Sequence, residues 1–288
     1  MIKLIASDMD GTLLNDDHMI SEENLKAIRK AQEMGRHFTI VTGRDYGAVK
    51  SYLEECNLKC ECILSNGAEY RDVNGNVIES IHMNKDTVKA IFDILNEENL
   101  CIQLMTNKGS YITNKDSDKK AIIDRFKLFN PKMSEEEVVE FVEEFHKTRG
   151  MNYIDDVYEI LESDIDILKI VTFDNDADLI ARLKEKLKEN TTDAAIASTF
   201  SNDIEISHIE AQKGLILAKV IEKMGIDRSE VIVLVLGDSF NDYSMFAEFE
   251  NSYAMENAIQ EIKEIAKYIT DTNNNDGVAK AIYKSLEM

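Results

Sequence analysis

The 288-residue chain has very little proline and few cysteines. Its one proline, Pro131, is too little to define a proline-rich linker between domains. The four cysteines lack the paired C-x-x-C spacing and the nearby histidine of a zinc site: Cys56, Cys60, Cys62 and Cys101. We therefore interpret them as reduced thiols of a cytosolic protein.

Long apolar runs and an excess of basic residues are also absent. No apolar run approaches the length needed to span a membrane, and the chain does not begin with the features of a signal peptide. Lys and Arg number 33 against 55 Asp and Glu, so the formal net charge is −22. This charge argues against nucleic acid as a partner, because phosphate backbones are held by clustered basic side chains. The sequence thus predicts a cytoplasmic protein that binds neither a membrane nor nucleic acid.

An acidic motif follows the first apolar stretch. That stretch places Leu4 and Ala6 on one strand face and Ile5 on the other, as in a central parallel strand covered by helices. Asp8 and Asp10 come next, and side chains two apart on a strand point the same way. We therefore expect both carboxylates in one crevice at the carboxyl end of the strand, where open α/β sheets bind ligands. Because they repel each other, we expect a cation such as Mg²⁺, which prefers oxygen ligands, beside them.

The segments after the motif alternate between helix and strand. The pattern predicts a helix capped by Ser21 that stops at Gly35, a strand over residues 37–41, a helix capped by Asp45, a strand over residues 62–65 and a hairpin over residues 70–81. Strand-helix-strand units of this length predict parallel pairing with right-handed crossovers.

From about residue 83 the order of elements becomes irregular. Strand-like runs cover residues 101–106, 110–113, 165–173, 194–200 and 204–207, and helical patterns start at Asn84 or Asp86, at Ser134 and at Leu179. The parallel rhythm returns with a helix after Lys213 and a strongly apolar strand over residues 231–236. We predict an α/β fold: a doubly wound, Rossmann-like parallel-sheet core of residues 1–82 and 208–288, with residues 83–207 inserted as an α+β cap domain.

Three further strand or helix ends are expected to reach the crevice. Thr42 and Gly43 offer a hydroxyl and a backbone N–H in a tight turn, which suits an anionic oxygen. Lys213 stands at a helix start, where a cation is unfavourable unless an anion such as phosphate is bound. Oxygen ligands follow the last long apolar strand, at Asp238, Asn241 and Asp242. Each feature alone is also typical of an ordinary turn, a solvated lysine or a helix cap, so the prediction depends on their combination.

In sequence order these pieces resemble the four signature motifs of the haloacid dehalogenase superfamily of phosphohydrolases, starting with residues 8–12 (DMDGT). The insert between Thr42 and Lys213 is similar to that of its Cof-like branch of cytoplasmic sugar-phosphate phosphatases, as are residues 65–68, 254–258 and 276–279. The likeness covers both ends of the chain, in the manner of a split domain. Ser239 and Glu256 depart from it mildly, since glycine is often found at both positions.

The resemblance implies a Mg²⁺-dependent phosphatase for small phosphorylated metabolites. Asp8 would form an aspartyl-phosphate, and Asp10 would act as general acid and base. Mg²⁺ would be held by the Asp8 carboxylate, the Asp10 backbone carbonyl and Asp238.

The remaining roles that the resemblance implies concern the phosphate and the cap. The phosphoryl oxygens would be bound by Thr42, Gly43, Lys213 and Asn241. Asp242 would orient Lys213 or a metal-bound water, and Arg44 and Asn66 could face a mobile cap that reads the rest of the substrate.

Other readings remain open at this point. A phosphosugar mutase would use the same aspartyl-phosphate but transfer the phosphoryl group to another sugar hydroxyl. A receiver-like signalling protein also combines an acidic cluster, a threonine and a lysine, but its phosphoacceptor would lie in mid-domain without an acid two residues later. The five histidines fall in no motif and receive no catalytic role.

Overall fold

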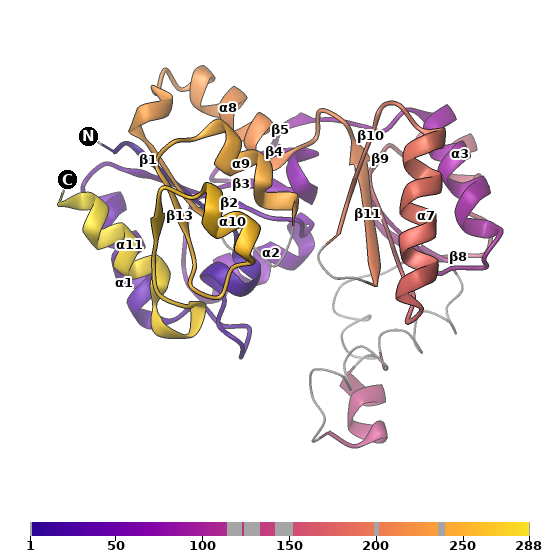
Figure 1. Cartoon of the computed structure of the whole chain (residues 1–288), viewed down its shortest axis with the longest axis horizontal. Helices are drawn as coiled ribbons and strands as arrows, with labels where there is room; N and C mark the ends of the chain where they lie inside the picture. The colour runs from indigo at the N-terminus through magenta and orange to yellow at the C-terminus, as the bar shows by residue number, and fades with distance from the viewer. Residues whose placement is uncertain are drawn as a thin grey trace. The chain divides into compact units, whose positions relative to one another are not determined.

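The computed structural model describes residues 2–113, 123, 133–141, 152–198, 202–235 and 240–287. The chain divides into two compact units, one formed by Met1–Ile81 with Glu210–Met288 and the other by His82–Ile209 (Figure 1). The first unit is thus built from both ends of the chain, and the second is inserted between them. None of the helices in the described ranges is both long enough and apolar enough to cross a bilayer.

The first unit contains an eight-stranded sheet in the order β14-β13-β12-β1-β2-β3-β4-β5. Its strands are β1 (Leu4–Ser7), β2 (His37–Val41), β3 (Glu61–Leu64), β4 (Glu69–Arg71), β5 (Val77–Ser80), β12 (Val231–Val235), β13 (Ser252–Ala254) and β14 (Tyr268–Ile269). The six strands from β14 to β3 pair in parallel. The last two, β4 and β5, form the predicted antiparallel hairpin.

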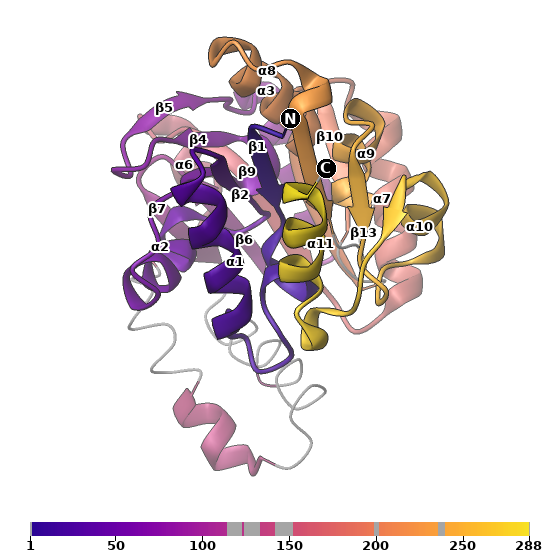
Figure 2. The same ribbon diagram turned by 90° about the vertical axis from the view of Figure 1, so that its left-hand side faces the viewer.

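Helices cover both faces of this sheet. One side carries α1 (Glu22–Glu33), α2 (Tyr46–Glu55) and α11 (Gly277–Leu286), and the other carries α8 (Lys213–Lys223), α9 (Tyr243–Glu248) and α10 (Gln260–Ile265). Both faces of β1 are apolar and need to be covered. Ile5 is buried under the helices of the first side, and Leu4 and Ala6 are buried under those of the second. Figure 2 shows α1 beside α11, and these helices pack against each other. The predicted doubly wound core is therefore confirmed.

Local sequence signals define the helix ends as expected. The side chain of Ser21 accepts a hydrogen bond from the backbone N–H of Asn24 at 3.1 Å, and Asp45 accepts one from Ala48 at 2.8 Å. Both side chains satisfy N–H groups that have no partner within the helix. Gly35 follows α1 with φ of +73°, a conformation that glycine adopts at little cost.

The second unit contains a six-stranded sheet in the order β10-β11-β9-β6-β7-β8. Its strands are β6 (Ile102–Thr106), β7 (Gly109–Thr113), β8 (Asn152–Ile154), β9 (Ile167–Phe173), β10 (Ala194–Ala197) and β11 (Asp203–His208). Neighbours pair antiparallel except β7 and β8. This mixed α+β architecture agrees with the irregular order of the predicted elements.

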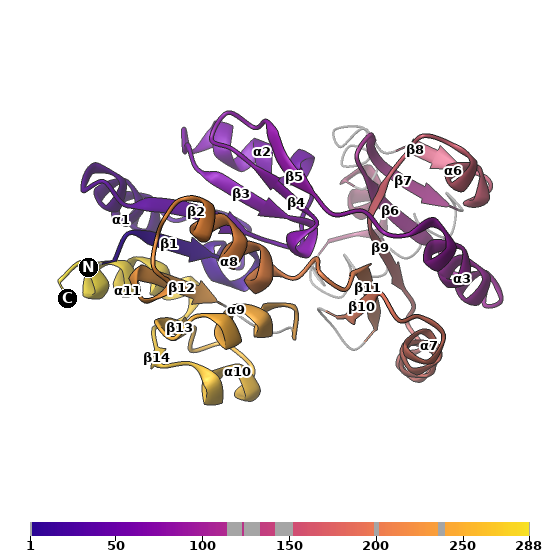
Figure 3. The ribbon, with the colours of Figure 1, turned by 90° about the horizontal axis from the view of Figure 1, so that it is seen from above.

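Helices of the second unit pack on one face of its sheet: α3 (Lys85–Asn96), α6 (Tyr158–Glu162) and α7 (Ala177–Asn190) (Figure 3). Sequence reasoning missed β8 and α6, because three-residue and five-residue elements show no periodicity. The helix expected from Ser134 begins there with a capping box. The N–H of Ser134 donates to Glu137 at 2.8 Å and that of Glu137 donates to Ser134 Oγ at 3.3 Å. Val142 and Phe145, which we expected on that helix, lie outside the described residues.

Candidate active site

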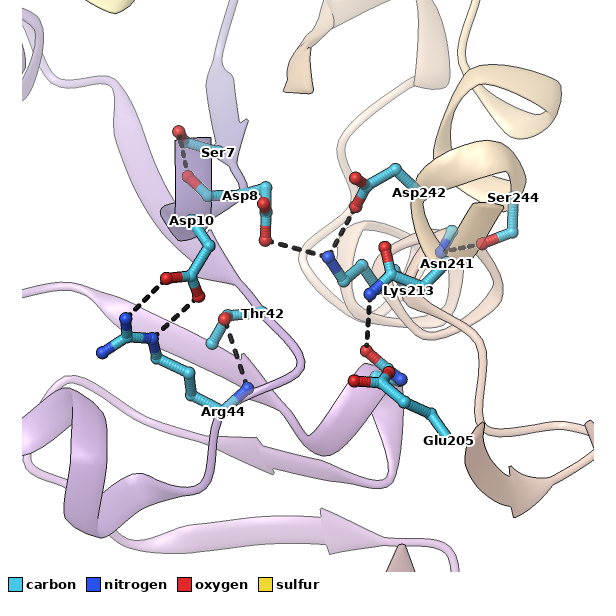
Figure 4. Close-up of polar contacts among 12 residues, drawn as sticks. Ser7, Asp8, Asp10, Thr42, Arg44, Glu205, Lys213, Asn241, Asp242 and Ser244 are labelled. Atoms are coloured by element: carbon cyan, nitrogen blue, oxygen red, sulfur yellow. Dashed lines mark hydrogen bonds and ion pairs between the residues drawn. The ribbon is translucent and has the colours of Figure 1, made fainter. Parts of the chain in front are cut away.

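Asp8 lies just beyond the end of β1. The strand ends at Ser7, Asp8 has an extended backbone, and Met9–Leu13 forms a turn in which Gly11 has φ of +60°. The two acids therefore lie beyond the strand, so the strand alternation from which we predicted their shared direction does not apply to them. In Figure 4 the two side chains point to different partners. Burial is the main cause that raises the pKa of Asp8, and the nearby charge of Asp10 raises it further.

A buried lysine joins two buried carboxylates. Lys213 Nζ lies 2.8 Å from Asp8 Oδ1 and 2.5 Å from Asp242 Oδ1. All three residues are 5% exposed or less. Burial acts to lower the pKa of Lys213, but the two carboxylates outweigh it and raise that pKa, so Lys213 is an ammonium ion. One positive charge therefore faces two carboxyl groups, and burial raises the pKa of Asp8 even though Lys213 opposes the change.

The position of Lys213 also resolves the conflict expected at the helix start. Lys213 is the first residue of α8, where the helix dipole disfavours a cation. The sequence predicted that a bound phosphate would remove this conflict. In the structure the carboxylates of Asp8 and Asp242 also offset the charge of Lys213.

Asp10 forms a two-point ion pair with Arg44. The guanidinium Nε donates to Asp10 Oδ2 at 2.8 Å, and Nη2 donates to Oδ1 at 2.5 Å. Partial burial acts to raise the pKa of Asp10, but the hydrogen bonds and charge of Arg44 outweigh it and lower that pKa. The side chain of Asp10 is 49% exposed, in contrast to the buried Asp8. The two acids are close in sequence, yet the pKa of Asp8 is raised and that of Asp10 is lowered.

The remaining polar candidates meet at the ends of β2 and β3. Thr42 is buried, and its backbone carbonyl accepts a hydrogen bond from Asn66 N at 3.1 Å. Asn241 Nδ2 donates to Asn66 Oδ1 at 3.3 Å. Ser65 and Asn66 have φ of +50° and +60° although neither is glycine. Such buried left-handed residues are strained and cluster at functional sites, and Gly43 directly follows Thr42 at the same strand end.

One predicted ligand, Asp238, lies outside the described residues, together with residues 236, 237 and 239. Within the described ranges, no group of three or more acidic, histidine or cysteine side chains is arranged to hold a metal ion. The donor chemistry nevertheless fits Mg²⁺. Asp8 and Asp242 are hard oxygen donors. Together they carry more negative charge than the one ammonium between them neutralises, so a nearby divalent cation would be favourable.

Three contacts to the site were not found by sequence reasoning. Asn257 Nδ2 donates to the carbonyl of Gly11 at 3.1 Å, and Asn273 Nδ2 donates to that of Leu14 at 3.1 Å. The hydroxyl of Tyr52 accepts a hydrogen bond from Arg44. The contact of Asn257 could have been found from residues 254–258, because that segment resembles the family. No pattern in the sequence signalled the others, which depend on how the helices pack.

Gly214 is required where α8 meets α9. A Cβ atom at this position would lie 2.1 Å from the carbonyl oxygen of Ser244, which is backbone and cannot rotate away. We expect Gly214→Ala to lower the free energy of unfolding by at least about 2–3 kcal/mol, measured by urea denaturation. The control is Gly225→Ala just after the same helix, where no atom lies within 4 Å and only the φ of +67° costs about 1 kcal/mol. Equal losses in both variants would contradict the packing explanation.

Comparisons with known proteins cover nearly the whole chain. A model of the haloacid dehalogenase-like hydrolases matches residues 5–282. The 5-amino-6-(5-phospho-D-ribitylamino)uracil phosphatase YcsE of Bacillus subtilis is 34% identical over 281 residues, which cover 98% of this chain and 94% of that protein. Phosphatase YwpJ of the same organism is 32% identical over 287 residues, with coverage of 96% and 98%. A solved haloacid dehalogenase-like hydrolase from B. subtilis has a TM-score of 0.84 at 32% identity, with coverage of 98% and 99%.

Proposed function

Because the chain belongs to the haloacid dehalogenase-like hydrolase family and is a phosphoric monoester hydrolase, we propose that it hydrolyses small phosphorylated metabolites such as sugar phosphates, with Mg²⁺ and through an aspartyl-phosphate on Asp8. The supporting observation is the buried Asp8 carboxylate, held 2.8 Å from the Lys213 ammonium at the carboxyl end of β1. A fixed, partly desolvated carboxylate beside a cation is suited to attack phosphorus.

The proposed reaction has two steps. Lys213 binds Asp8 Oδ1, so we assign the attack on phosphorus to Oδ2. As the new O–P bond forms, the bond to the leaving oxygen breaks, and that oxygen takes a proton from Asp10. Because Arg44 lowers the pKa of Asp10, this carboxylate must first exchange one contact with Arg44 for a proton taken up from water. Asp10 then accepts a proton from the water that attacks the aspartyl-phosphate, which releases inorganic phosphate and restores Asp8.

The surrounding residues would hold the phosphoryl group and the metal. Thr42, Gly43, Lys213 and Asn241 would bind phosphoryl oxygens and stabilise the charge that spreads over them, while Asp242 orients Lys213. Mg²⁺ would be held by the Asp8 carboxylate, the Asp10 backbone carbonyl and Asp238, and it would supply positive charge for the phosphate in this acidic protein.

The inserted unit would serve as the cap that reads the rest of the substrate. Along β11, the core residues Ile204 and Ile206 alternate with polar residues on the opposite face, where β9 contributes Lys169 beside the apolar Val171. On that face, Lys169 Nζ lies 2.9 Å from Glu205 Oε2. A charged pair fixed on a sheet supports recognition of hydroxyl groups, as in sugars.

Release of inorganic phosphate tests this proposal. Phosphosugars, nucleotides, cofactor phosphates and a phosphoribitylaminouracil, the substrate class named for YcsE, would be screened with Mg²⁺ and with EDTA. We expect turnover to fall at least about a hundredfold in EDTA and to return with Mg²⁺. A metal-loaded protein that is inert toward all these esters would contradict the proposal. Phosphate release without an activating bisphosphate would distinguish it from a mutase.

A further inference from the structure

The guanidinium that binds Asp10 is itself held by a tyrosine. Arg44 Nη1 donates to the hydroxyl of Tyr52 at 3.3 Å, and the Arg44 Cζ atom lies 5.3 Å from the centre of the Tyr52 ring. Tyr52 belongs to α2 and packs against the core layer that contains Val49 and Leu58. The tip of Arg44 is therefore fixed by a helix rather than by the loop that carries its backbone.

We propose that Tyr52 is a positioning residue for the reaction: it fixes the guanidinium of Arg44 and thereby the carboxylate of Asp10. This inference rests on the proposed function, in which Asp10 transfers a proton to the leaving oxygen. Asp10 lies within the Met9–Leu13 turn and its side chain is half exposed. Among the residues that the structure describes, Arg44 donates hydrogen bonds to both of its carboxylate oxygens.

Arg44 needs support at its tip because its side chain is long and flexible. Its backbone is already fixed, since Arg44 N donates to Thr42 Oγ1 at 3.2 Å and its carbonyl accepts from Ser65 N at 2.9 Å. Holding the side chain costs rotamer entropy of up to about 2 kcal/mol, and the aromatic ring offsets part of it by stacking. With the guanidinium fixed, one oxygen of Asp10 can exchange its contact with Arg44 for the leaving oxygen while the other stays bound.

Substitutions of Tyr52 should therefore act on the protonation of the leaving group. The probe is a series of aryl phosphates from p-nitrophenyl to phenyl, and the measurement is kcat/KM, which reports the step that phosphorylates Asp8. We expect Tyr52→Leu to lower kcat/KM about tenfold for phenyl phosphate and less than twofold for p-nitrophenyl phosphate, whose leaving group needs little protonation. Tyr52→Phe keeps the ring and should cause an intermediate loss, which keeps the test valid if Tyr52→Leu folds poorly.

A matched control lies on the same helix. Tyr46 also contacts an arginine, because the Arg71 Cζ atom lies 4.2 Å from the centre of the Tyr46 ring. The guanidinium of Arg71, however, is bound to Glu69. We expect Tyr46→Leu to change kcat/KM by one common factor for all esters, since it alters α2 without touching Asp10 or Arg44.

The Asp10→Asn variant separates the inference from the proposed function. If Asp10 is the acid, Asp10→Asn alone loses more activity toward phenyl phosphate than toward p-nitrophenyl phosphate, and adding Tyr52→Leu changes nothing further. Equal loss for all esters in Asp10→Asn would refute the acid role and the inference together. A leaving-group effect in Asp10→Asn but a uniform loss in Tyr52→Leu and Tyr52→Phe would overturn the inference about Tyr52 alone.

Discussion

Replacing Asp8 with asparagine is expected to lower phosphatase turnover by about 10⁴-fold or more while the protein stays folded. An amide oxygen is a much weaker nucleophile than a carboxylate, so the aspartyl-phosphate cannot form at a useful rate. The measurement is release of p-nitrophenol from p-nitrophenyl phosphate in the presence of Mg²⁺. The control is Asp17→Asn, which changes an exposed acid in the following turn and should leave turnover unchanged.

The same variant should be at least as stable as the wild type without metal. Burial raises the pKa of Asp8, which means that its charged form is disfavoured in the folded state. A folded-state pKa above the unfolded value reduces stability at neutral pH, and a neutral asparagine removes that penalty. We therefore expect an equal or higher Tm in EDTA. Mg²⁺ should raise the Tm of the wild type, because it binds the native state, but not that of Asp8→Asn. A variant that keeps its Mg²⁺-dependent turnover would show that Asp8 is not the nucleophile.

Replacing Lys213 with methionine is expected to lower the free energy of unfolding by roughly 3–5 kcal/mol and to abolish activity. The ammonium lies 2.8 Å and 2.5 Å from two carboxylates, and all three groups are buried. Without it, Asp8 and Asp242 would face each other without a cation. Breaking a buried charge network by removing one partner is costly because the other charges stay in a region of low dielectric constant. Urea denaturation in EDTA measures the stability loss.

Two comparisons make the Lys213 result specific. Lys223 ends the same helix, but it is exposed and pairs with Glu79 at the surface, so Lys223→Met should cost less than about 1 kcal/mol. Combining Lys213→Met with Asp8→Asn and Asp242→Asn removes the unpaired charges and should restore most of the stability without restoring activity. If Lys213→Met were as stable as the wild type, the buried ion pairs could not be what holds α8 to the end of β1.

Much of the fold could be predicted from the sequence because its signals are local. Caps at Ser21 and Asp45 act over three residues, and the hydrophobic pattern of β1 already indicates helices on both faces. The resemblance to the haloacid dehalogenase superfamily is confirmed over residues 5–282. The roles assigned to individual site residues stay predictions that the variants above test.

The tertiary structure alone decided how the site residues pair. Asp8 and Lys213 are 205 positions apart, and their contact depends on how α8 packs against the sheet. Sequence reasoning expected a phosphate to interact with Lys213 and Asp242 to orient it, but it did not indicate the ion pair between Lys213 and Asp8. It also expected that Arg44 could face the cap, but it did not indicate the contacts of Arg44 with Asp10 and Tyr52.

The sequence by itself thus determined the elements, the order of the motifs and the class of chemistry, since these follow from neighbouring residues and their periodicity. Only the tertiary structure decided which charge meets which, because electrostatic energy depends on distances and burial that arise when distant segments pack together.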